Sequence, residues 1–471
     1  MTVNHTVVNL TVETHTEKDI AMVTPAVDNS GTPKGRPGSG VTRRELLRGG
    51  LLGAAALAAP GLLSACDSGT TGGSGGTEGG KAKVRLWTWY TEQEKQWPQL
   101  AQEFMASHPN VVVEPRVIDY DAYLPALQAA VAGGDPPEIF APHVLGIEYG
   151  KAGISADLKA ELGADFLSDF FTSTNDEFSD AGKQYALGWM AQTFGIFYDP
   201  DIFARAKVDV PETWDDLMEV SNKIKSATNL MPCVVSNNPG SNGPDFVLPL
   251  ITQAANDPQL VLDLDFGRNG ARWDNPKVIE ALTKVDQLVK GGAFAPNPNG
   301  IPDEQAGQLL YTGKAAMFYS GSWVPQGFAG SAPKAFVERY KVMETPAWTS
   351  GAKHWCANQA GAGLAVSAKS RNKDAALEFI KFMYEPARYA KVMNDSNSMP
   401  STNAAGDQVT DPVVKQMTSW LLAGNGAPHI LFGKGSAGAA TNAFAGLLGG
   451  SLTPEKTAAA IQADVEKART R

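Results

Sequence analysis

Basic residues, cysteine and long apolar runs are all scarce in this chain of 471 residues, and each shortage excludes a class of function. The 40 Lys and Arg are outnumbered by 50 Asp and Glu, which gives a net charge of −10. Nucleic acids and anionic membrane surfaces select basic proteins, so neither is an expected partner. The apolar run at residues 49–63 is shorter than the roughly 20 residues that span a bilayer, and we expect no permanent transmembrane helix there.

Sequence signatures of catalysis and metal binding are also missing. The chain has no H-E-x-x-H, no phosphate-binding G-x-x-x-x-G-K-[ST] and no C-x-x-C, and its six histidines lack metal-ligand spacing. Residues 72–76 match G-x-S-x-G, but no predicted strand precedes them and no predicted helix follows. We therefore expect no cofactor, no metal and no enzyme, although a pair of carboxylates for glycoside hydrolysis stays open in a chain of this size.

The N-terminal segment reads as an export signal. Arg43 and Arg44 precede the apolar run, and the run ends in small residues at Cys66, which is the order found in signal peptides. The paired arginines resemble a twin-arginine export signal, and residues 63–66 resemble a bacterial lipobox, whose cysteine is lipid-modified and begins the mature chain. We expect a disordered leader and signal peptide at residues 1–65, and a lipidated Cys66 followed by a flexible tether to residue 80.

The two other cysteines are Cys233 and Cys356. They could form one disulfide in an oxidising compartment, or they could remain two separate buried thiols. Their spacing does not decide between these alternatives.

Strands and helices alternate after the tether. Residues 83–87, 111–117 and 138–140 are predicted strands, and apolar periodicity predicts helices that begin near Trp97 and at residues 119–132 between them. This alternation implies a parallel sheet, in which ligands bind outside the carboxyl ends of the strands.

Later segments carry clear helix signals. Thr213 and Asp216 form a predicted capping box, and Trp214 is assigned to the buried face of the helix that follows. Residues 236–249 are rich in Gly, Pro and Asn and are predicted to form a loop. Further helices are predicted at residues 276–289, 305–313 and 374–384, and further strands at residues 315–319 and 364–367.

Four segments together resemble the family 1 extracellular solute-binding proteins, the sugar-binding receptors of ABC importers related to maltose-binding protein. They are residues 133–139 (GGDPPEI), residues 185–217 with FYDPDIF and PETWDDL, residues 313–323 with GKAAM and GSW, and residues 361–380. Their order extends over nearly the whole chain beyond the tether. One departure is Asp199, which stands where the family usually has Asn.

The resemblance implies an α/β, two-lobed periplasmic-binding-protein-like fold of type II. Lobe one would comprise residues 81–193 and 364–400, and lobe two residues 194–363 and 401–471. Crossing hinge segments would lie near residues 193–198 and 361–366. The resemblance also implies a monomeric receptor that is anchored by Cys66 to the outer face of the cell membrane and delivers its ligand to an ABC permease.

A sugar site needs flat aromatic surfaces and short polar side chains. The candidate ligand contacts are Trp89, Tyr90, Glu92, Asp121, His143, Trp189, Asp245, Trp323 and Trp355. For each of them the alternative is a structural role, such as a core position for Trp189 or a helix start for Asp121. An anionic ligand would require Arg or Lys beside the aromatic rings, so we expect an uncharged sugar or a cationic ligand. The remaining alternatives are a non-sugar solute and a carbohydrate-cleaving enzyme.

Overall fold

One mixed β-sheet organises the part of the chain that the structure describes. The computed structural model describes residues 77–78, 80–238, 242–431 and 433–470. The predictions for the signal peptide, for Cys66 and for the tether up to residue 76 lie outside these residues. The predicted end of the tether is wrong, because Thr77–Glu78 form a strand, β1, that pairs antiparallel with β2. The sheet follows the order β1-β2-β4-β11-β7-β9-β8, with β3 paired to β2, β10 to β7 and β12 to β11.

The strands of this sheet have the following bounds. They are β1 (Thr77–Glu78), β2 (Lys81–Thr88), β3 (Val111–Val117), β4 (Ile139–Phe140), β7 (Leu187–Tyr198), β8 (Met231–Val235), β9 (Ala315–Gly321), β10 (Lys341–Met343), β11 (Cys356–Val366) and β12 (Gly426–Ala427). A separate hairpin pairs β5 (Ser179–Asp180) with β6 (Lys183–Gln184).

The predicted parallel pairing at the start of the sheet is confirmed. β2 pairs in parallel with both β3 and β4, and the helices α1 (Gln96–Ser107) and α2 (Tyr120–Ala132) lie between these strands in sequence. The sheet as a whole is mixed, because β11 runs antiparallel to β4 and to β7.

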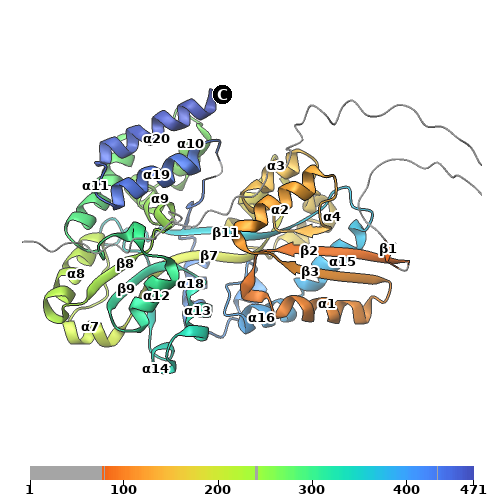
Figure 1. The fold of residues 1–471 in the computed structure, drawn as a ribbon, viewed down its shortest axis with the longest axis horizontal. Helices are drawn as coiled ribbons and strands as arrows, with labels where there is room; N and C mark the ends of the chain where they lie inside the picture. Colours follow the sequence, from red (N-terminus) through yellow and green to blue (C-terminus); the bar gives the residue numbers. More distant parts are fainter. Residues whose placement is uncertain (1–76, 79, 239–241, 432, 471) are drawn as a thin grey trace, which may run out of the picture. The chain divides into compact units, whose positions relative to one another are not determined.

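Two lobes are built on this sheet, each with its own buried core. We call lobe one the part around β2, β3 and β4, and lobe two the part around β8 and β9. β7 and β11 belong to both: Trp189 and Leu364 are buried in the core of lobe one, whereas Phe194 and Ala357 are buried in that of lobe two. Figure 1 shows these paired strands running between the two groups of helices. The predicted hinge segments fall on them, and the residue boundaries of the lobes stay a prediction.

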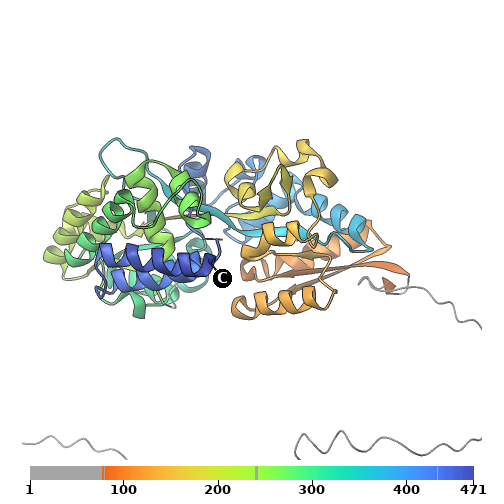
Figure 2. The same ribbon diagram turned by 90° about the horizontal axis from the view of Figure 1, so that it is seen from above.

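Short helices dominate the first part of lobe one after α2. Their bounds, with the 3-10 helices written η, are η1 (Thr91–Gln93), η2 (His143–Leu145), α3 (Gly146–Lys151), α4 (Leu158–Leu162), α5 (Ala164–Leu167), α6 (Thr172–Asn175) and η3 (Asp176–Phe178). The later helices α15 (Lys373–Met383), α16 (Pro386–Asp395) and α17 (Asn403–Gly406) follow β11. α15 contacts both α1 and β2, so segments far apart in the sequence share one core (Figure 2).

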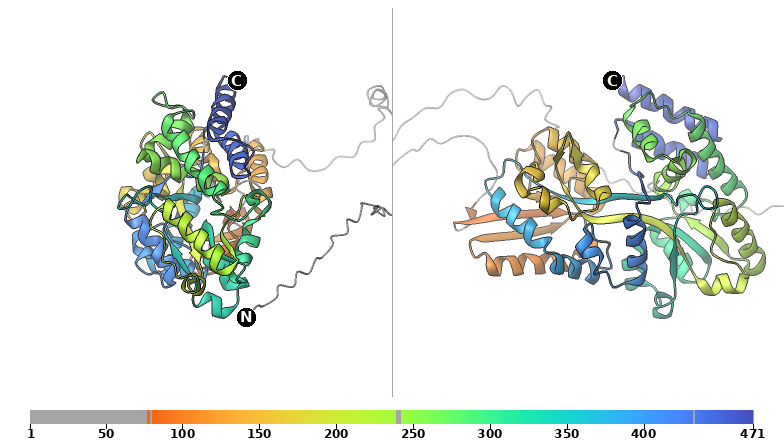
Figure 3. Two further views of the ribbon diagram at one scale, coloured as in Figure 1. Left: turned by 90° about the vertical axis from the view of Figure 1, so that its left-hand side faces the viewer. Right: turned by 180° about the vertical axis from the view of Figure 1, so that it is seen from behind.

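Lobe two is mainly helical outside its strands. Its helices are α7 (Pro200–Ala206), α8 (Trp214–Thr228), α9 (Asn242–Ala255), α10 (Pro258–Phe266), α11 (Pro276–Lys290), η4 (Pro298–Gly300), α12 (Asp303–Tyr311), α13 (Val324–Ser331), α14 (Lys334–Val337), α18 (Pro412–Leu422), α19 (Ser436–Leu448) and α20 (Pro454–Arg469). The C-terminal helices α19 and α20 pack on each other and on α11, and α19 also packs on α9 (Figure 3). No described helix is both long and apolar enough to cross a membrane.

The helix signals around residue 213 are confirmed. The Thr213 side chain accepts a hydrogen bond from the Asp216 amide, and the Asp216 side chain accepts one from the Thr213 amide, so the capping box is complete. Trp214 is fully buried on the inner face of α8, where its Nε1 donates to Gln253 Oε1 at 2.7 Å.

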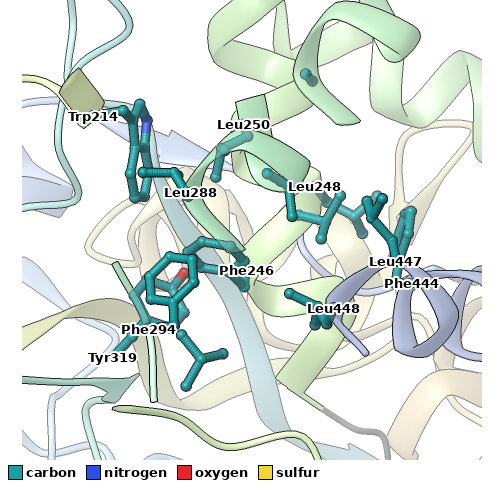
Figure 4. Close-up of a cluster of buried hydrophobic side chains, with 14 of the residues drawn as sticks. Trp214, Phe246, Leu248, Leu250, Leu288, Phe294, Tyr319, Phe444, Leu447 and Leu448 are labelled. Atoms are coloured by element: carbon teal, nitrogen blue, oxygen red, sulfur yellow. The ribbon is translucent and has the colours of Figure 1, made fainter. Parts of the chain in front are cut away.

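The predicted loop at residues 236–249 is wrong in its second half. α9 begins at Asn242 and continues through Pro249, because Phe246, Leu248 and Leu250 are buried among the helices and strands of lobe two (Figure 4). Proline removes the amide that would bond to the carbonyl four residues earlier, which is that of Asp245. Tyr319 Oη donates to that carbonyl at 2.8 Å and replaces the missing bond.

The side chains also answer two points that the sequence raised, the state of the two cysteines and the role of Asp199. Cys233 and Cys356 are both free and buried, and burial raises the pKa of each thiol to about 12. Asp199, the departure from the family pattern, caps α7 through the amide of Asp201 and pairs with Arg339 at 2.8 Å. That position therefore stabilises lobe two.

Candidate ligand-binding cavity

A cavity of about 700 Å³ is lined by residues of both lobes. Its volume falls within the range of roughly 300 to 1,000 Å³ that is usual for small-molecule sites. Lobe one contributes Trp89, Thr91, Glu92, Asp119, Tyr120, His143, Val144, Glu177 and Phe178. Lobe two contributes Asn242, Pro244, Asp245, Asp303, Trp323, His429, Ile430, Leu431, Ala437 and Thr441, and Gln192 and Phe194 come from β7.

Trp89 directly follows β2, at the carboxyl end of a parallel strand where α/β sheets bind ligands. Its ring packs edge to face against Tyr90 and Tyr123, with centroids 4.8 Å apart in each pair, and lies 4.9 Å from the ring of His143. Tyr123 is itself fixed, since its hydroxyl donates to the carbonyl of Ala141 at 2.8 Å. The half-buried indole of Trp89 is therefore held in place as a side of the cavity.

Trp323 is the corresponding aromatic side chain of lobe two. Its Nε1 donates to Asp303 Oδ2 at 2.8 Å, and its ring packs edge to face on Phe194 with centroids 5.1 Å apart. Asp303 also accepts from Ser236 Oγ at 2.8 Å and Asn242 Nδ2 at 3.0 Å. Asp303 thus connects β8, α9 and Trp323 at the first residue of α12.

Asp245 lies in the first turn of α9 and pairs with His429. The Asp245 Oδ1 and His429 Nδ1 atoms are 2.6 Å apart, and the His429 side chain is 2 % exposed. Burial raises the pKa of Asp245, and the hydrogen bond from His429 opposes that effect. The pair ties α9 to the segment before α19.

Glu92 and Glu177 lie in the short helices η1 and η3 of lobe one. Burial raises the pKa of both carboxyl groups. Both carboxyl oxygens of Glu177 are buried and have no hydrogen-bond partner in the described part of the chain. His143, also on this side, has a pKa lowered by burial, and its Nε2 lies 3.2 Å from Tyr120 Oη.

A second, smaller cavity of about 300 Å³ shares three side chains with the first, those of Glu92, Asp303 and Trp323. Tyr311, Phe318 and Phe328 give it an aromatic lining, and Gly327 of α13 forms part of its edge. Trp323 therefore borders both cavities.

Five of the nine candidate residues line the main cavity: Trp89, Glu92, His143, Asp245 and Trp323. Asp121 belongs to α2, but its side chain lies outside what the structure describes. The remaining three, Tyr90, Trp189 and Trp355, do not line the cavity.

The contacts of each of these three side chains explain why it does not line the cavity. Tyr90 points into the core, where its hydroxyl donates to the carbonyl of Gly363 at 2.8 Å. Trp189 is fully buried with its ring 4.9 Å from that of Trp97. Trp355 donates from Nε1 to Asn256 Oδ1 at 3.1 Å and stacks under Lys353.

The lining residues that the sequence did not single out include Glu177, Asp303 and His429. Glu177 stands in a stretch with no pattern of its own, and His429 and Asp303 reach the cavity only through long-range packing. The one local signal was at Asp303, where Pro302 followed by two acids is typical of a helix start. Within the described residues, no group of three or more His, Cys, Asp and Glu side chains is placed to hold a metal ion.

Comparisons with known proteins agree on the family to which this chain is similar. The model of the bacterial extracellular solute-binding protein family matches residues 88–389. The diacetylchitobiose binding protein DasA of Streptomyces coelicolor is 25 % identical over 325 residues, covering 68 % of this chain and 74 % of that protein. A maltotriose-binding protein of Pyrococcus abyssi is 25 % identical over 351 residues, covering 72 % and 70 %.

The fold has relatives among solved structures. The GacH receptor of Streptomyces glaucescens, solved unliganded and with acarbose, superposes with a TM-score of 0.70 at 21 % identity, covering 82 % of this chain and 98 % of that chain. At this identity the likeness concerns the fold alone, and it agrees with the two lobes described above.

Proposed function

The chain belongs to the bacterial extracellular solute-binding proteins, and on that premise we propose that it binds a sugar or oligosaccharide in the main cavity and delivers it to an ABC permease. The observation that carries this proposal is the presence of Trp89 and Trp323, from different lobes, on the same cavity together with several carboxyl groups. Aromatic faces pack on the C–H faces of sugar rings, and carboxylates accept hydrogen bonds from sugar hydroxyls.

The named relatives support the same class of ligand. One is named for diacetylchitobiose and another for maltotriose, and both match along most of their length. They are binding proteins, which favours a binding role over a catalytic one for this chain. They differ in their sugars, so the particular sugar is a matter for experiment.

The delivery mechanism that we propose uses the two long strands β7 and β11 as hinges. Ligand bound to both lobes stabilises the closed arrangement, and the permease recognises that arrangement. We place the hinge movements at residues 193–198 and 361–366.

The anchoring that we propose rests on Cys66. A lipid on this cysteine, with the tether between it and β1, would hold the monomeric receptor at the outer face of the cell membrane. Cys66→Ser should release the protein into the medium, as measured by fractionation and immunoblotting, with ligand affinity within twofold of the parent. Retention of this variant on the membrane would contradict the lipid anchor.

A tryptophan-fluorescence titration against a panel of mono- and oligosaccharides tests the binding function. A saturable change is expected for at least one sugar, and it should shrink in Trp89→Phe and in Trp323→Phe. Trp355→Phe is the matched control, because Trp355 does not line the cavity and should leave the change intact.

Two outcomes would overturn the proposal. The absence of a saturable change with every sugar in the panel would remove the sugar assignment. The appearance of reducing ends on incubation with oligosaccharides would favour a carbohydrate-cleaving enzyme instead.

A further inference from the structure

The Asp and Glu side chains of the main cavity are not balanced by Lys or Arg in its described lining. Glu92, Asp119, Glu177, Asp245 and Asp303 line it, and no Lys or Arg is present among its described lining residues. Charges at contact distance interact strongly at the reduced effective dielectric near and below a protein surface. The charge of a bound ligand therefore matters strongly in this cavity.

The two acids of lobe two already have structural partners. Asp303 accepts from Ser236, Asn242 and Trp323, and Asp245 pairs with His429. These bonds account for the presence of both carboxyl groups without any ligand.

Glu92 and Glu177 lack such partners. Both carboxyl oxygens of Glu177 are buried and have no hydrogen-bond partner among the described residues, whereas the half-buried carboxyl group of Glu92 accepts only from its own backbone amide there. A buried carboxyl group without a partner is destabilising, so Glu177 in particular can gain a partner from a ligand.

We propose that the ligand is a saccharide with a protonated amino group, and that Glu92 and Glu177 are the carboxylates that bind this group. The inference rests on the proposed function and names its substrate class. An ammonium group supplies hydrogen-bond donors together with a positive charge, whereas a hydroxyl group can donate a hydrogen bond to a carboxylate but carries no charge. Trp89 lies on the same side of the cavity and would pack on the adjoining sugar ring.

Matched ligands isolate the charge. β-1,4-linked glucosamine oligomers, N-acetylglucosamine oligomers and cello-oligosaccharides of equal length differ only in the group at carbon 2. Isothermal titration calorimetry at neutral pH should give the glucosamine series an affinity at least tenfold higher than that of the cello-oligosaccharides. Raising the salt concentration should reduce this preference.

Charge-neutral variants then test the two residues. Glu177→Gln and Glu92→Gln should each reduce the preference for the amino series at least fivefold, measured as the ratio of the affinities for the glucosamine and cello-oligosaccharide series in the same variant. Asp464→Asn, at an exposed acid of α20, is the matched control and should change neither value. If one Gln variant fails to fold, the other still gives the measurement.

The outcomes separate this inference from the proposed function. A neutral sugar that binds at least as tightly as its amino counterpart overturns the inference and leaves sugar binding in place. A preference for the amino series that survives both Gln substitutions overturns the assignment of Glu92 and Glu177. The absence of binding by any sugar overturns the inference together with the proposed function.

Discussion

The two sides of the cavity carry the same kinds of side chain but hold them differently. On the lobe-two side, which we call the bonded wall, each acid has a partner. Asp303 accepts hydrogen bonds from Trp323 and Ser236, and Asp245 pairs with His429. On the lobe-one side, the open wall, Trp89 is fixed by ring packing while Glu92 and Glu177 have no partner side chain among the described residues. The comparison teaches that the acids of the bonded wall are held by donors of the protein itself, whereas both carboxyl oxygens of Glu177 on the open wall have no donor among the described residues.

The largest effect should come from breaking the bonded wall at Asp303. Asp303→Ala removes an acceptor shared by Ser236, Ser320 and Trp323 and should lower the free energy of unfolding by about 3 kcal/mol, because the buried hydroxyls of Ser236 and Ser320 lose this partner. Urea denaturation measures this loss. Glu304→Ala, at the exposed neighbour, should stay within about 0.5 kcal/mol. Equal losses in the two variants would show that Asp303 does not organise this wall.

Glu177→Gln should raise the free energy of unfolding rather than lower it, and the size of this gain should depend on pH. Burial raises the pKa of Glu177 above its ordinary value of 4.5, so the folded state favours the protonated carboxyl group. The contribution of this group to stability is complete below pH 4.5 and declines as the pH rises toward the raised pKa. The neutral Gln avoids that decline, so the variant should match the parent near pH 4 and exceed it by about 1 kcal/mol or more at about pH 8.

Thermal and chemical unfolding across this pH range make the measurement. A stability difference between Glu177→Gln and the parent that stays constant with pH would show that Glu177 is ionised at no extra cost in the folded protein. Glu177 on the open wall would then be accommodated as favourably as the acids of the bonded wall.

The smallest effect concerns the second cavity behind Trp323. Apart from its chain neighbours and the backbone of its own helix, no atom of the described residues lies within 4 Å of the position that a Cβ would take at Gly327, so Gly327→Leu can place its side chain beside that cavity without a clash at the Cβ. We expect about a fivefold loss of affinity, or about 1 kcal/mol, for saccharides long enough to pass Trp323, and no change for disaccharides.

Gly330→Leu is the control for this prediction. Gly330 lies in the same helix α13 with the same open space and does not line the cavity. Titration of an oligosaccharide series measures both variants. A loss that is equal for all chain lengths, or equal in the two variants, would exclude the second cavity as part of the binding region.

Local signals predicted the elements well but predicted the site only in part. The capping box at Thr213 and the strand before Trp89 depend on neighbouring residues, and both are present in the structure. Trp89 and Tyr90 show where such signals stop: they are adjacent, yet one lines the cavity and the other bonds to Gly363 in the core. Gly363 lies on β11, far from Tyr90 in the sequence, so local signals do not display this contact.

Other misses have the same origin. The composition of residues 236–249 favours a loop, but burial of Phe246 and Leu250 stabilises a helix there. Glu177 and His429 carry no pattern in the sequence and reach the cavity through contacts between distant segments. Long-range packing, which a single sequence does not display, determined these positions.

The hydroxyl of Tyr319 has a consequence for the order of folding. Pro249 leaves α9 with a carbonyl, that of Asp245, which no amide of the helix can reach, and Tyr319 on β9 supplies the donor. The helix therefore cannot complete its own hydrogen bonding as an isolated segment and gains its full stability only when the strand has docked. The full stability of the helix that carries Asp245 is in this way coupled to assembly of the sheet in lobe two.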